Sequence, residues 1–208
     1  MQYRVIDIDN WKRGKLFREY IDGLRMVMSL TVDVDVTNLI RFCKEHGLKF
    51  YPAMMHVVSS VINAHSEFKH GWDESGNLIE WETVFPLFAE FHPEDEAFTR
   101  ISVEYCEDLF EFCACVEVAR DRYRHLRGFE FTPPKNTFDV SCLPWVKYRH
   151  VDMHVFDAGK YLSPSVTWGK YDENGIMPLS MNLHHAVADG FHLSRFFNEV
   201  QERILELK

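Results

Sequence analysis

PLSMNLHHAVADGFHLSRF, residues 178–196, is the stretch in which a strand pattern passes through a turn into a helix. Every second residue of its first half is apolar: Leu179, Met181 and Leu183. This period of two is typical of a strand with one buried face. Continuing it places His185 on the buried face and His184 on the opposite face. Because a buried imidazole needs a hydrogen-bond partner, the pattern singles out His185.

The second half of the same stretch predicts a helix that begins after Gly190. Asp189 is a residue type that commonly caps a helix N-terminus, and Gly190 suits the turn before the helix. The apolar residues that follow share one side of the expected helix: Leu193, Phe196, Phe197, Val200 and Ile204. Such spacing is typical of an amphipathic helix packed on a sheet.

Helix and strand patterns alternate along the rest of the chain. Helices are expected from an Asn10 cap to Tyr20, from Thr37 to a C-terminal cap at Gly47, from Pro52, and over residues 106–126. A strand is expected over residues 26–34, and hairpin turns at DESGN (73–77) and DENG (172–175). No linker or repeat divides the chain. The sequence therefore predicts one α/β domain over residues 1–208 with a mixed sheet, and it leaves the strand order open.

The composition is that of an ordinary globular protein. Of 208 residues, 46% are hydrophobic and 26% are charged, and no apolar run reaches the roughly 18 residues that span a bilayer. The start of the chain lacks the basic-then-apolar order of a signal peptide, so a cytoplasmic protein is expected. A net charge of −9 repels phosphate backbones and argues against nucleic acid as a partner. The five cysteines lack paired CxxC spacing and predict neither a disulfide framework nor a zinc ribbon.

His185, Asp189 and Gly190 form the pattern HxxxDG, which places a carboxylate and a flexible turn beside an imidazole. Each residue also has a purely structural explanation, because a buried histidine is more often a hydrogen-bonded core residue and Asp189 suits an N-cap. Imidazole is the side chain whose pKa suits a general base near neutral pH. The pattern by itself leaves both explanations open.

The full string HHAVADGFH (184–192) resembles the signature of the chloramphenicol acetyltransferase family, and HxxxDG occurs in several CoA-dependent acyltransferase families. Further segments resemble that family in order: NWKRGKLF (10–17), LKFYPAM (48–54), FHPEDEAF (91–98), VSCLPWV (140–146) and TWGKY (167–171). The resemblance covers nearly the whole chain. It implies a two-layer sandwich of a mixed sheet against helices, and an acetyl-CoA-dependent O-acetyltransferase that acts on chloramphenicol or a related small alcohol and gives antibiotic resistance.

The resemblance also implies roles for individual residues. Nε2 of His185 would take the proton of the acceptor hydroxyl while the oxygen attacks the thioester, and the backbone carbonyl of His185 itself would hold the other ring nitrogen. Asp189 would pair with Arg13. Ser141 would donate a hydrogen bond to the tetrahedral oxyanion, and Thr167 would assist through a bound water.

Binding residues follow from the same resemblance. The acceptor would be bound by aromatic and aliphatic residues: Tyr20, Leu24, Phe98, Val151, Met153 and Val155. Acetyl-CoA would be bound, without a metal, by Lys49, Lys170, Trp145 and Tyr171. The resemblance further implies a homotrimer in which His185 of one subunit faces the acceptor pocket of its neighbour.

Some positions depart from the family pattern in or beside the acceptor pocket. Glu19 stands where an aromatic residue is usual, and Arg100 where a small residue is usual. Leu87 and Ala89 stand where drug-acetylating members carry small or amide-bearing polar residues. Burying Glu19 and Arg100 is costly unless they pair with each other or with a charged acceptor. We therefore expect weak acetylation of chloramphenicol and a pocket suited to another alcohol.

Other functions compete with acetyl transfer. Ser141, His185 and Asp189 are the residue types of a hydrolase triad, but no GxSxG surrounds this serine and it lies inside an apparent strand. His184, His185 and His192 are suited to bind zinc, although strand geometry directs the first two to opposite faces. A lipoyl-dependent acyltransferase shares HxxxDG but normally carries upstream domains, for which we expect no room before the first strand. A non-catalytic relative of the same fold is the remaining alternative.

Overall fold

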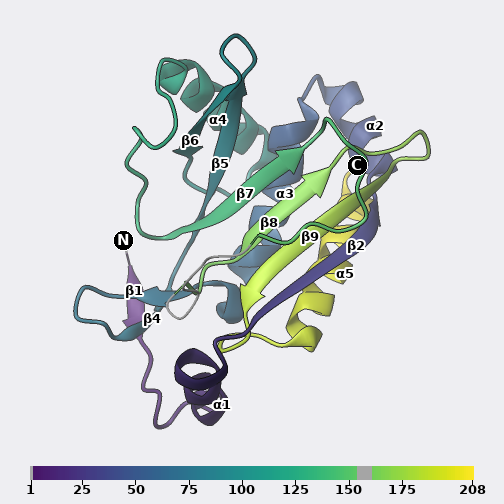
Figure 1. Cartoon of the computed structure of the whole chain (residues 1–208). Helices are drawn as coiled ribbons and strands as arrows, with labels where there is room; N and C mark the ends of the chain where they lie inside the picture. Colours follow the sequence, from purple (N-terminus) through teal and green to yellow (C-terminus); the bar gives the residue numbers. More distant parts are fainter. Residues whose placement is uncertain (1, 154–160) are drawn as a thin grey trace.

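The computed structural model describes residues 2–153 and 161–208, and a six-stranded mixed sheet forms its centre (Figure 1). In spatial order the strands are β2 (Val27–Asp35), β9 (Ile176–His184), β8 (Ser165–Gly169), β7 (Thr137–Leu143), β5 (Phe85–His92) and β6 (Ala97–Ser102). The pairs β5–β7 and β7–β8 are parallel, and the other pairs are antiparallel. The predicted mixed sheet is confirmed.

Helices cover one face of this sheet and form the second layer (Figure 1). They are α2 (Thr37–His46), α3 (Phe50–Ala64) and α5 (Gly190–Glu206), while α4 (Leu109–Tyr123) lies beside β6. Shorter elements are α1 (Gly14–Arg18), the π-helix η1 (Glu19–Leu24), the 3-10 helix η2 (Ser66–Phe68), and a small sheet of β1 (Tyr3–Val5), β4 (Leu78–Trp81) and β3 (His70–Trp72). No helix within residues 2–153 and 161–208 is long and apolar enough to cross a membrane.

The first helix begins later than the sequence predicts. Asn10, the expected N-cap, instead donates its side-chain amide to the carboxylate of Asp7 at 2.7 Å. This local turn delays the start of α1 to Gly14. The end of α2 is as expected, because Gly47 follows it with a left-handed φ of 66°. Both predicted hairpin turns connect antiparallel neighbours, β3 with β4 and β8 with β9.

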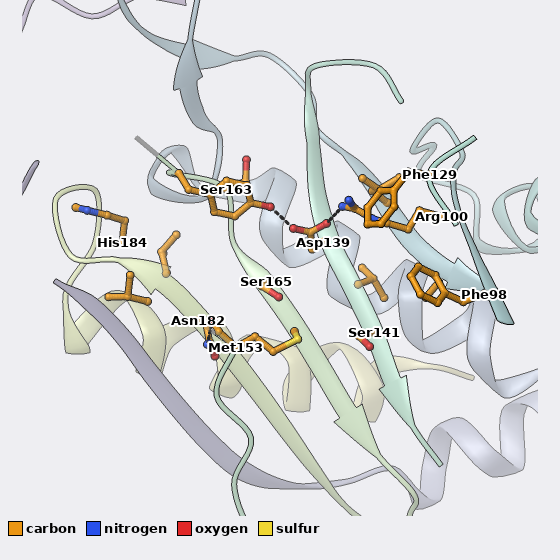
Figure 2. Close-up of a pocket in the computed structure, with 16 residues that line it drawn as sticks. Phe98, Arg100, Phe129, Asp139, Ser141, Met153, Ser163, Ser165, Asn182 and His184 are labelled. Carbon is orange, nitrogen blue, oxygen red and sulfur yellow. Dashed lines mark hydrogen bonds and ion pairs between the residues drawn. The ribbon is translucent and has the colours of Figure 1, made fainter. Parts of the chain in front are cut away.

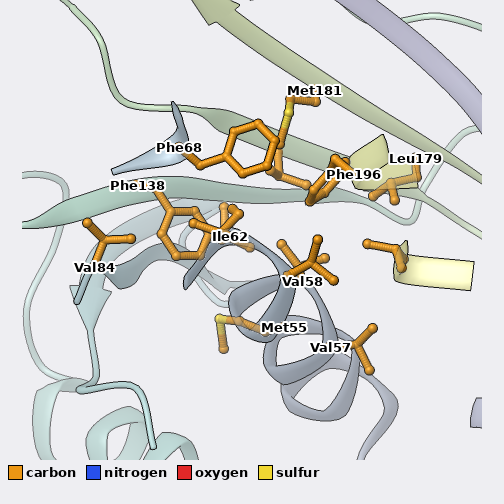
Figure 3. Packing of buried hydrophobic residues seen from close by; sticks show 14 of the residues in the cluster. Met55, Val57, Val58, Ile62, Phe68, Val84, Phe138, Leu179, Met181 and Phe196 are labelled. Carbon is orange, nitrogen blue, oxygen red and sulfur yellow. The ribbon is translucent and has the colours of Figure 1, made fainter. Parts of the chain in front are cut away.

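The apolar core lies between the sheet and the helix layer (Figure 3). Met181 of β9 shares this core with Ile62 of α3, Phe138 of β7 and Phe196 of α5, and each is at most 1% exposed. The five apolar residues predicted on one side of the last helix are all at most 3% exposed. Burying a side chain of this size contributes roughly 1.5–3 kcal/mol, so these contacts fix α5 against β9.

The opposite face of the sheet is polar, and it carries the candidate site. The strand register aligns hydroxyl side chains across four strands: Ser141, Thr167, Ser180 and Thr31. Residues 144–153 cross this face over β9 and β2 (Figure 1), where the Asn182 amide donates to the carbonyl of Met153 at 3.1 Å. Strand β9 is therefore covered on both faces.

Candidate active site

Strand β9 ends at His184, and the two adjacent histidines have different surroundings. His184 is 1% exposed, and its Nδ1 accepts the backbone N–H of Ala186 at 3.1 Å. His185 is half-buried in the turn after the strand, and its ring stacks on Tyr20 with centroids 4.1 Å apart. The prediction that places His185 on the buried strand face was wrong, because the period of two stops where the strand stops.

A hydrogen bond to Ala188 determines the tautomer of the His185 ring. Nδ1 of His185 lies 2.8 Å from the backbone oxygen of Ala188. A carbonyl oxygen can only accept, so Nδ1 carries the proton and the neutral ring keeps its lone pair on Nε2. The expectation that the carbonyl of His185 itself holds Nδ1 was wrong, because Nδ1 bonds the oxygen of Ala188 instead; the oxygen of His185 accepts from Arg13 at 2.8 Å.

Arg13 holds the turn that carries His185. Its guanidinium donates to the backbone oxygens of His185, Ala186 and Ala188, each at 2.8 Å. It also pairs with Asp189 at 3.0 Å, so the pairing implied by the resemblance is present. Because Arg13 and His185 share the oxygen of Ala188, the guanidinium fixes the same carbonyl that orients the imidazole.

Asp189 belongs to the helix cap and is not a partner of His185. Its Oδ1 accepts the backbone N–H of Phe191 at 3.2 Å, which satisfies one free donor of the first turn of α5. Burial acts to raise the pKa of Asp189, but the hydrogen bond from Arg13 and the charges of His192 and Arg13 outweigh it, so the pKa is lowered. The carboxylate therefore stays ionised beside the turn.

A pocket of about 640 Å³ opens on the polar face of the sheet (Figure 2). It is lined by Val27, Leu87, Ala89, Phe98, Arg100, Phe129, Asp139, Val140, Ser141, Met153, Tyr161, Ser163, Ser165, Asn182, Leu183 and His184. Of the predicted acceptor-binding residues, Phe98 and Met153 line it. Tyr20, Leu24 and Val151 lie outside the lining, and Val155 falls outside the described residues. We name this cavity the sheet pocket.

Charges in the sheet pocket are arranged differently from the sequence-based prediction. Arg100 pairs with Asp139, as Figure 2 shows, and the hydroxyl of Tyr161 donates to the same carboxylate. Glu19 is exposed at the start of η1 and does not line the pocket. Glu19 and Arg100 therefore do not pair with each other, which was one of the two ways left open to offset their charges. The physical reason is that Asp139 of β7, which is separated from Arg100 of β6 by strand β5, already pairs with the guanidinium.

A second pocket of about 460 Å³ adjoins the first. Trp145, Lys170 and Tyr171, three of the residues predicted to bind acetyl-CoA, line it. Ala89 lines both pockets, at the point where β5 and β7 separate after their last pair, Phe88 with Val140. Ala89 therefore borders both cavities, beside the place where β5 and β7 stop pairing.

Lys49, predicted to bind acetyl-CoA, and Thr167, predicted to assist catalysis, are not part of either pocket lining. Lys49 forms an ion pair with Glu117 and is outside both linings. Thr167 is 2% exposed and is paired in the ladder with Ser141. Among the described residues its buried hydroxyl has no hydrogen-bond partner, and Thr167 lines neither pocket.

The family model of chloramphenicol acetyltransferase matches residues 1–201. A chloramphenicol acetyltransferase of Clostridium perfringens is 36% identical, over 97% of this chain and 94% of its own length. One of Vibrio anguillarum is 36% identical over 100% and 97%, and chloramphenicol acetyltransferase 3 of Escherichia coli is 33% identical over 97% of both chains. The chain belongs to the chloramphenicol acetyltransferase family.

Solved structures agree with this membership at the level of the fold. A chloramphenicol acetyltransferase structure covers 100% of both chains with a TM-score of 0.85 at 22% identity. The cubic core of the pyruvate dehydrogenase multienzyme complex covers 99% of this chain and 91% of that chain, with a TM-score of 0.65 at 16% identity. The expected acyltransferase fold is confirmed.

Several lining residues of this family member were missed by the sequence-based prediction. Asp139 lies two residues before Ser141 on β7, so the period of two could have indicated it. Ser165 and Asn182 face each other across β8 and β9, a register that no local pattern reveals. Phe129 and Tyr161 lie outside regular elements and therefore carry no periodic signal.

Among the residues that the structure describes, neither the hydrolase triad nor the zinc site is formed. A hydrolase triad would need Asp189 on His185, but the carboxylate bonds Arg13 and the imidazole bonds Ala188. Within residues 2–153 and 161–208, no group of three or more His, Cys, Asp or Glu side chains is placed to hold a metal ion.

Proposed function

We propose that the protein transfers an acetyl group from acetyl-CoA to a hydroxyl of chloramphenicol or a related small alcohol. The observation that carries this proposal is the orientation of His185. Its Nδ1 donates to Ala188, so its Nε2 lone pair is available as a base. Membership of the chloramphenicol acetyltransferase family supports the same reaction.

The reaction balances as a direct transfer. Nε2 of His185 accepts the hydroxyl proton while the acceptor oxygen bonds to the thioester carbonyl carbon. The carbonyl oxygen becomes an oxyanion, to which the Ser141 hydroxyl donates a hydrogen bond. The intermediate then collapses, the C–S bond breaks, and the thiolate takes the proton from the imidazolium. The products are the acetyl ester and free CoA, and no acyl-enzyme is formed.

We further propose that a second copy of the chain completes the site, in a homotrimer. His185 is absent from the lining of its own sheet pocket, whereas Ser141 is part of it. Apolar side chains around the pocket remain exposed: Phe98 at 42%, Phe129 at 73%, Met153 at 42% and Tyr161 at 38%. A neighbour's turn with His185 would cover them, and a head-to-tail interface of this kind closes into a ring.

Acetyl-CoA fits the second pocket best. The phosphates of CoA are anionic, and the chain has a net charge of −9, so local cations must offset the overall field. Lys170 lines the pocket, and Trp145 and Tyr171 supply apolar surface. Since Ala89 borders both pockets, this placement would bring the thioester toward Ser141.

The test is a screen of hydroxyl-bearing acceptors with acetyl-CoA, beginning with chloramphenicol. Free thiol is measured with a colorimetric reagent, and the ester is identified by mass spectrometry. We expect CoA release in a one-to-one ratio with ester, and no release by the His185→Ala variant. Absence of acceptor-dependent thiol release with every alcohol in the screen would contradict the proposal.

A further inference from the structure

The wall of the sheet pocket contains a group of three linked polar side chains, which we call the Arg100–Asp139–Tyr161 cluster. Arg100 donates to Oδ1 of Asp139, and Tyr161 donates to Oδ2 of the same carboxylate (Figure 2). All three residues line the pocket. Arg100 lies on β6, Asp139 on β7, and Tyr161 in the segment that precedes β8.

The cluster is neutral as a whole but retains hydrogen-bonding capacity. The charge of Arg100 cancels that of Asp139. One N–H of the guanidinium is used by Asp139, and the Phe129 ring lies 5.3 Å from its centre. A guanidinium has five N–H donors, so most of the donors of Arg100 have no acceptor among the described residues. Desolvation of the hydroxyl and the negative charge of Asp139 raise the pKa of Tyr161, so the hydroxyl stays protonated although the ring is partly exposed.

The strand geometry sets the distance from the cluster to the reacting centre. Asp139 and Ser141 lie two residues apart on β7 and both line the sheet pocket. Two residues of a strand span roughly 7 Å. An acceptor whose hydroxyl reacts beside Ser141 therefore extends a second group to the cluster at about that distance.

We propose that the Arg100–Asp139–Tyr161 cluster selects acceptors that carry an uncharged hydroxyl or amide group roughly 7 Å from the reacting hydroxyl. This inference rests on the proposed function, because it treats the sheet pocket as the acceptor site. A hydroxyl or amide both donates and accepts, and it can bond the free N–H groups of Arg100 and the lone pairs of Asp139. An apolar group at the same place would displace water from these partly exposed groups and leave them unpaired, which a binding site penalises.

A matched pair of primary alcohols tests the selectivity. Both share an aromatic body, and one ends in a carboxamide while the other ends in an isopropenyl group of similar shape. We expect kcat/KM of the native enzyme to favour the amide by at least about tenfold, mainly through KM, since each lost hydrogen bond is worth roughly that factor. Equal values for the two alcohols would overturn the inference.

Variants of the cluster test whether it causes the preference for the amide alcohol, measured as the ratio of kcat/KM for the two alcohols. The double change Arg100→Leu with Asp139→Leu removes both charges together, so neither is stranded, and it should reverse the preference toward the apolar alcohol. Tyr161→Phe removes one donor and should shift the ratio in the same direction by a smaller factor. The control is Lys135→Leu with Glu74→Leu, an exposed ion pair outside the sheet pocket, which should leave the ratio unchanged. An unchanged ratio in a folded double variant would show that the cluster is only structural.

A binding measurement separates this inference from the proposed function. Calorimetry with the His185→Ala variant reports acceptor affinity without turnover. The amide alcohol should bind about tenfold more tightly than its apolar match, and the double variant should abolish that difference. If acetyl transfer fails but the affinity difference is found, the proposed acetyl transfer is wrong and the proposed recognition by the cluster is supported. If transfer succeeds without any affinity difference, the recognition is wrong.

Discussion

At the scale of single residues, His185 is the side chain on which the proposed chemistry depends. His185→Ala should lower kcat by at least about a hundredfold, because it removes the general base. The fold should survive, since the half-buried ring makes one hydrogen bond, to Ala188. Steady-state kinetics and circular dichroism check these two outcomes.

His184 is the matched control for that change. It is 1% exposed and bonds the backbone N–H of Ala186. His184→Ala should therefore lower the unfolding free energy by about 1 to 3 kcal/mol, since it strands a buried donor, and it should affect the rate less than His185→Ala. Equal losses of kcat in folded forms of both variants would argue against His185 as the base.

Ser141 supplies the second residue-scale prediction. Ser141→Ala should lower kcat by about a hundredfold with little change in KM, because an oxyanion donor acts mainly in the transition state. Rapid-quench kinetics with labelled acetyl-CoA measures the chemical step. A stable acetyl group trapped on Ser141 in the native enzyme would instead favour a covalent, hydrolase-like mechanism.

The position of His185 and the partner of Arg100 could be predicted from the sequence only in part. The motif identified His185, but the period of two misplaced it because the sequence does not mark His184 as the last strand residue. Arg100 was recognised as unusual, yet Glu19 was the only partner within the chain that the sequence suggested for it. Asp139 lies on β7, which β5 separates from the strand of Arg100, and this placement depends on a strand order that periodicity cannot supply.

At the scale of elements, the turn between β9 and α5 is stabilised mainly by hydrogen bonds from Arg13, which lies outside the turn, just before α1. Arg13→Ala should lower the unfolding free energy by about 1 to 3 kcal/mol, because it removes donors from three part-buried backbone carbonyls; Asp189 is partly exposed and keeps His192 as a partner. The same change should also lower kcat, since the carbonyl of Ala188 would no longer be fixed behind the imidazole. Urea denaturation and kinetics measure the two effects.

Arg13→Lys separates charge from geometry in the same turn. A lysine keeps the positive charge near Asp189 but cannot reach all four acceptors at once. It should recover part of the stability and little of kcat. Full recovery of kcat by lysine would show that the guanidinium does not position His185.

The elements themselves were predictable to different degrees. Helix α5 and strand β9 follow from strong periodic patterns, and both glycine-bearing hairpin turns are where DESGN and DENG indicate. The start of α1 was missed because Asp7 competes for the side chain of Asn10, a contact that the residue types alone do not predict. The irregular segments that carry Phe129 and Tyr161 have no pattern to read.

At the scale of the whole molecule, the proposed site shared between subunits would make activity depend on assembly. Light scattering should give a mass three times the 24.6 kDa of one chain, and specific activity should fall on dilution below the dissociation constant of the trimer. A fully active monomer would contradict the shared site.

Mixing inactive His185→Ala with inactive Ser141→Ala subunits should restore part of the activity, because some interfaces then combine an intact His185 with an intact Ser141.

Stability of the whole fold should decrease in mild acid because of buried histidines. Burial lowers the pKa of His56, His70 and His184 below the ordinary value of 6.5. As the pH falls below 6.5, the unfolded chain binds protons that the native state does not, so the unfolding free energy falls. Each histidine contributes at most about 1.4 kcal/mol per pH unit, until the pH passes its native pKa.

His70 allows this decrease to be dissected. It is 2% exposed, its ring contacts that of Trp11 at a tilt of 40°, and neither ring nitrogen has a hydrogen-bond partner among the described residues. His70→Phe keeps the ring and removes the titration, so it should flatten the pH dependence between 7.5 and 5.5 and raise stability at the lower pH. Urea denaturation at fixed protein concentration measures both effects. Carboxylates with lowered pKa values, such as Asp189, change the unfolding free energy only as the pH falls below about 4. They therefore do not contribute between pH 7.5 and 5.5. An unfolding free energy that stays constant over that range would show that these imidazoles are not buried in the neutral form.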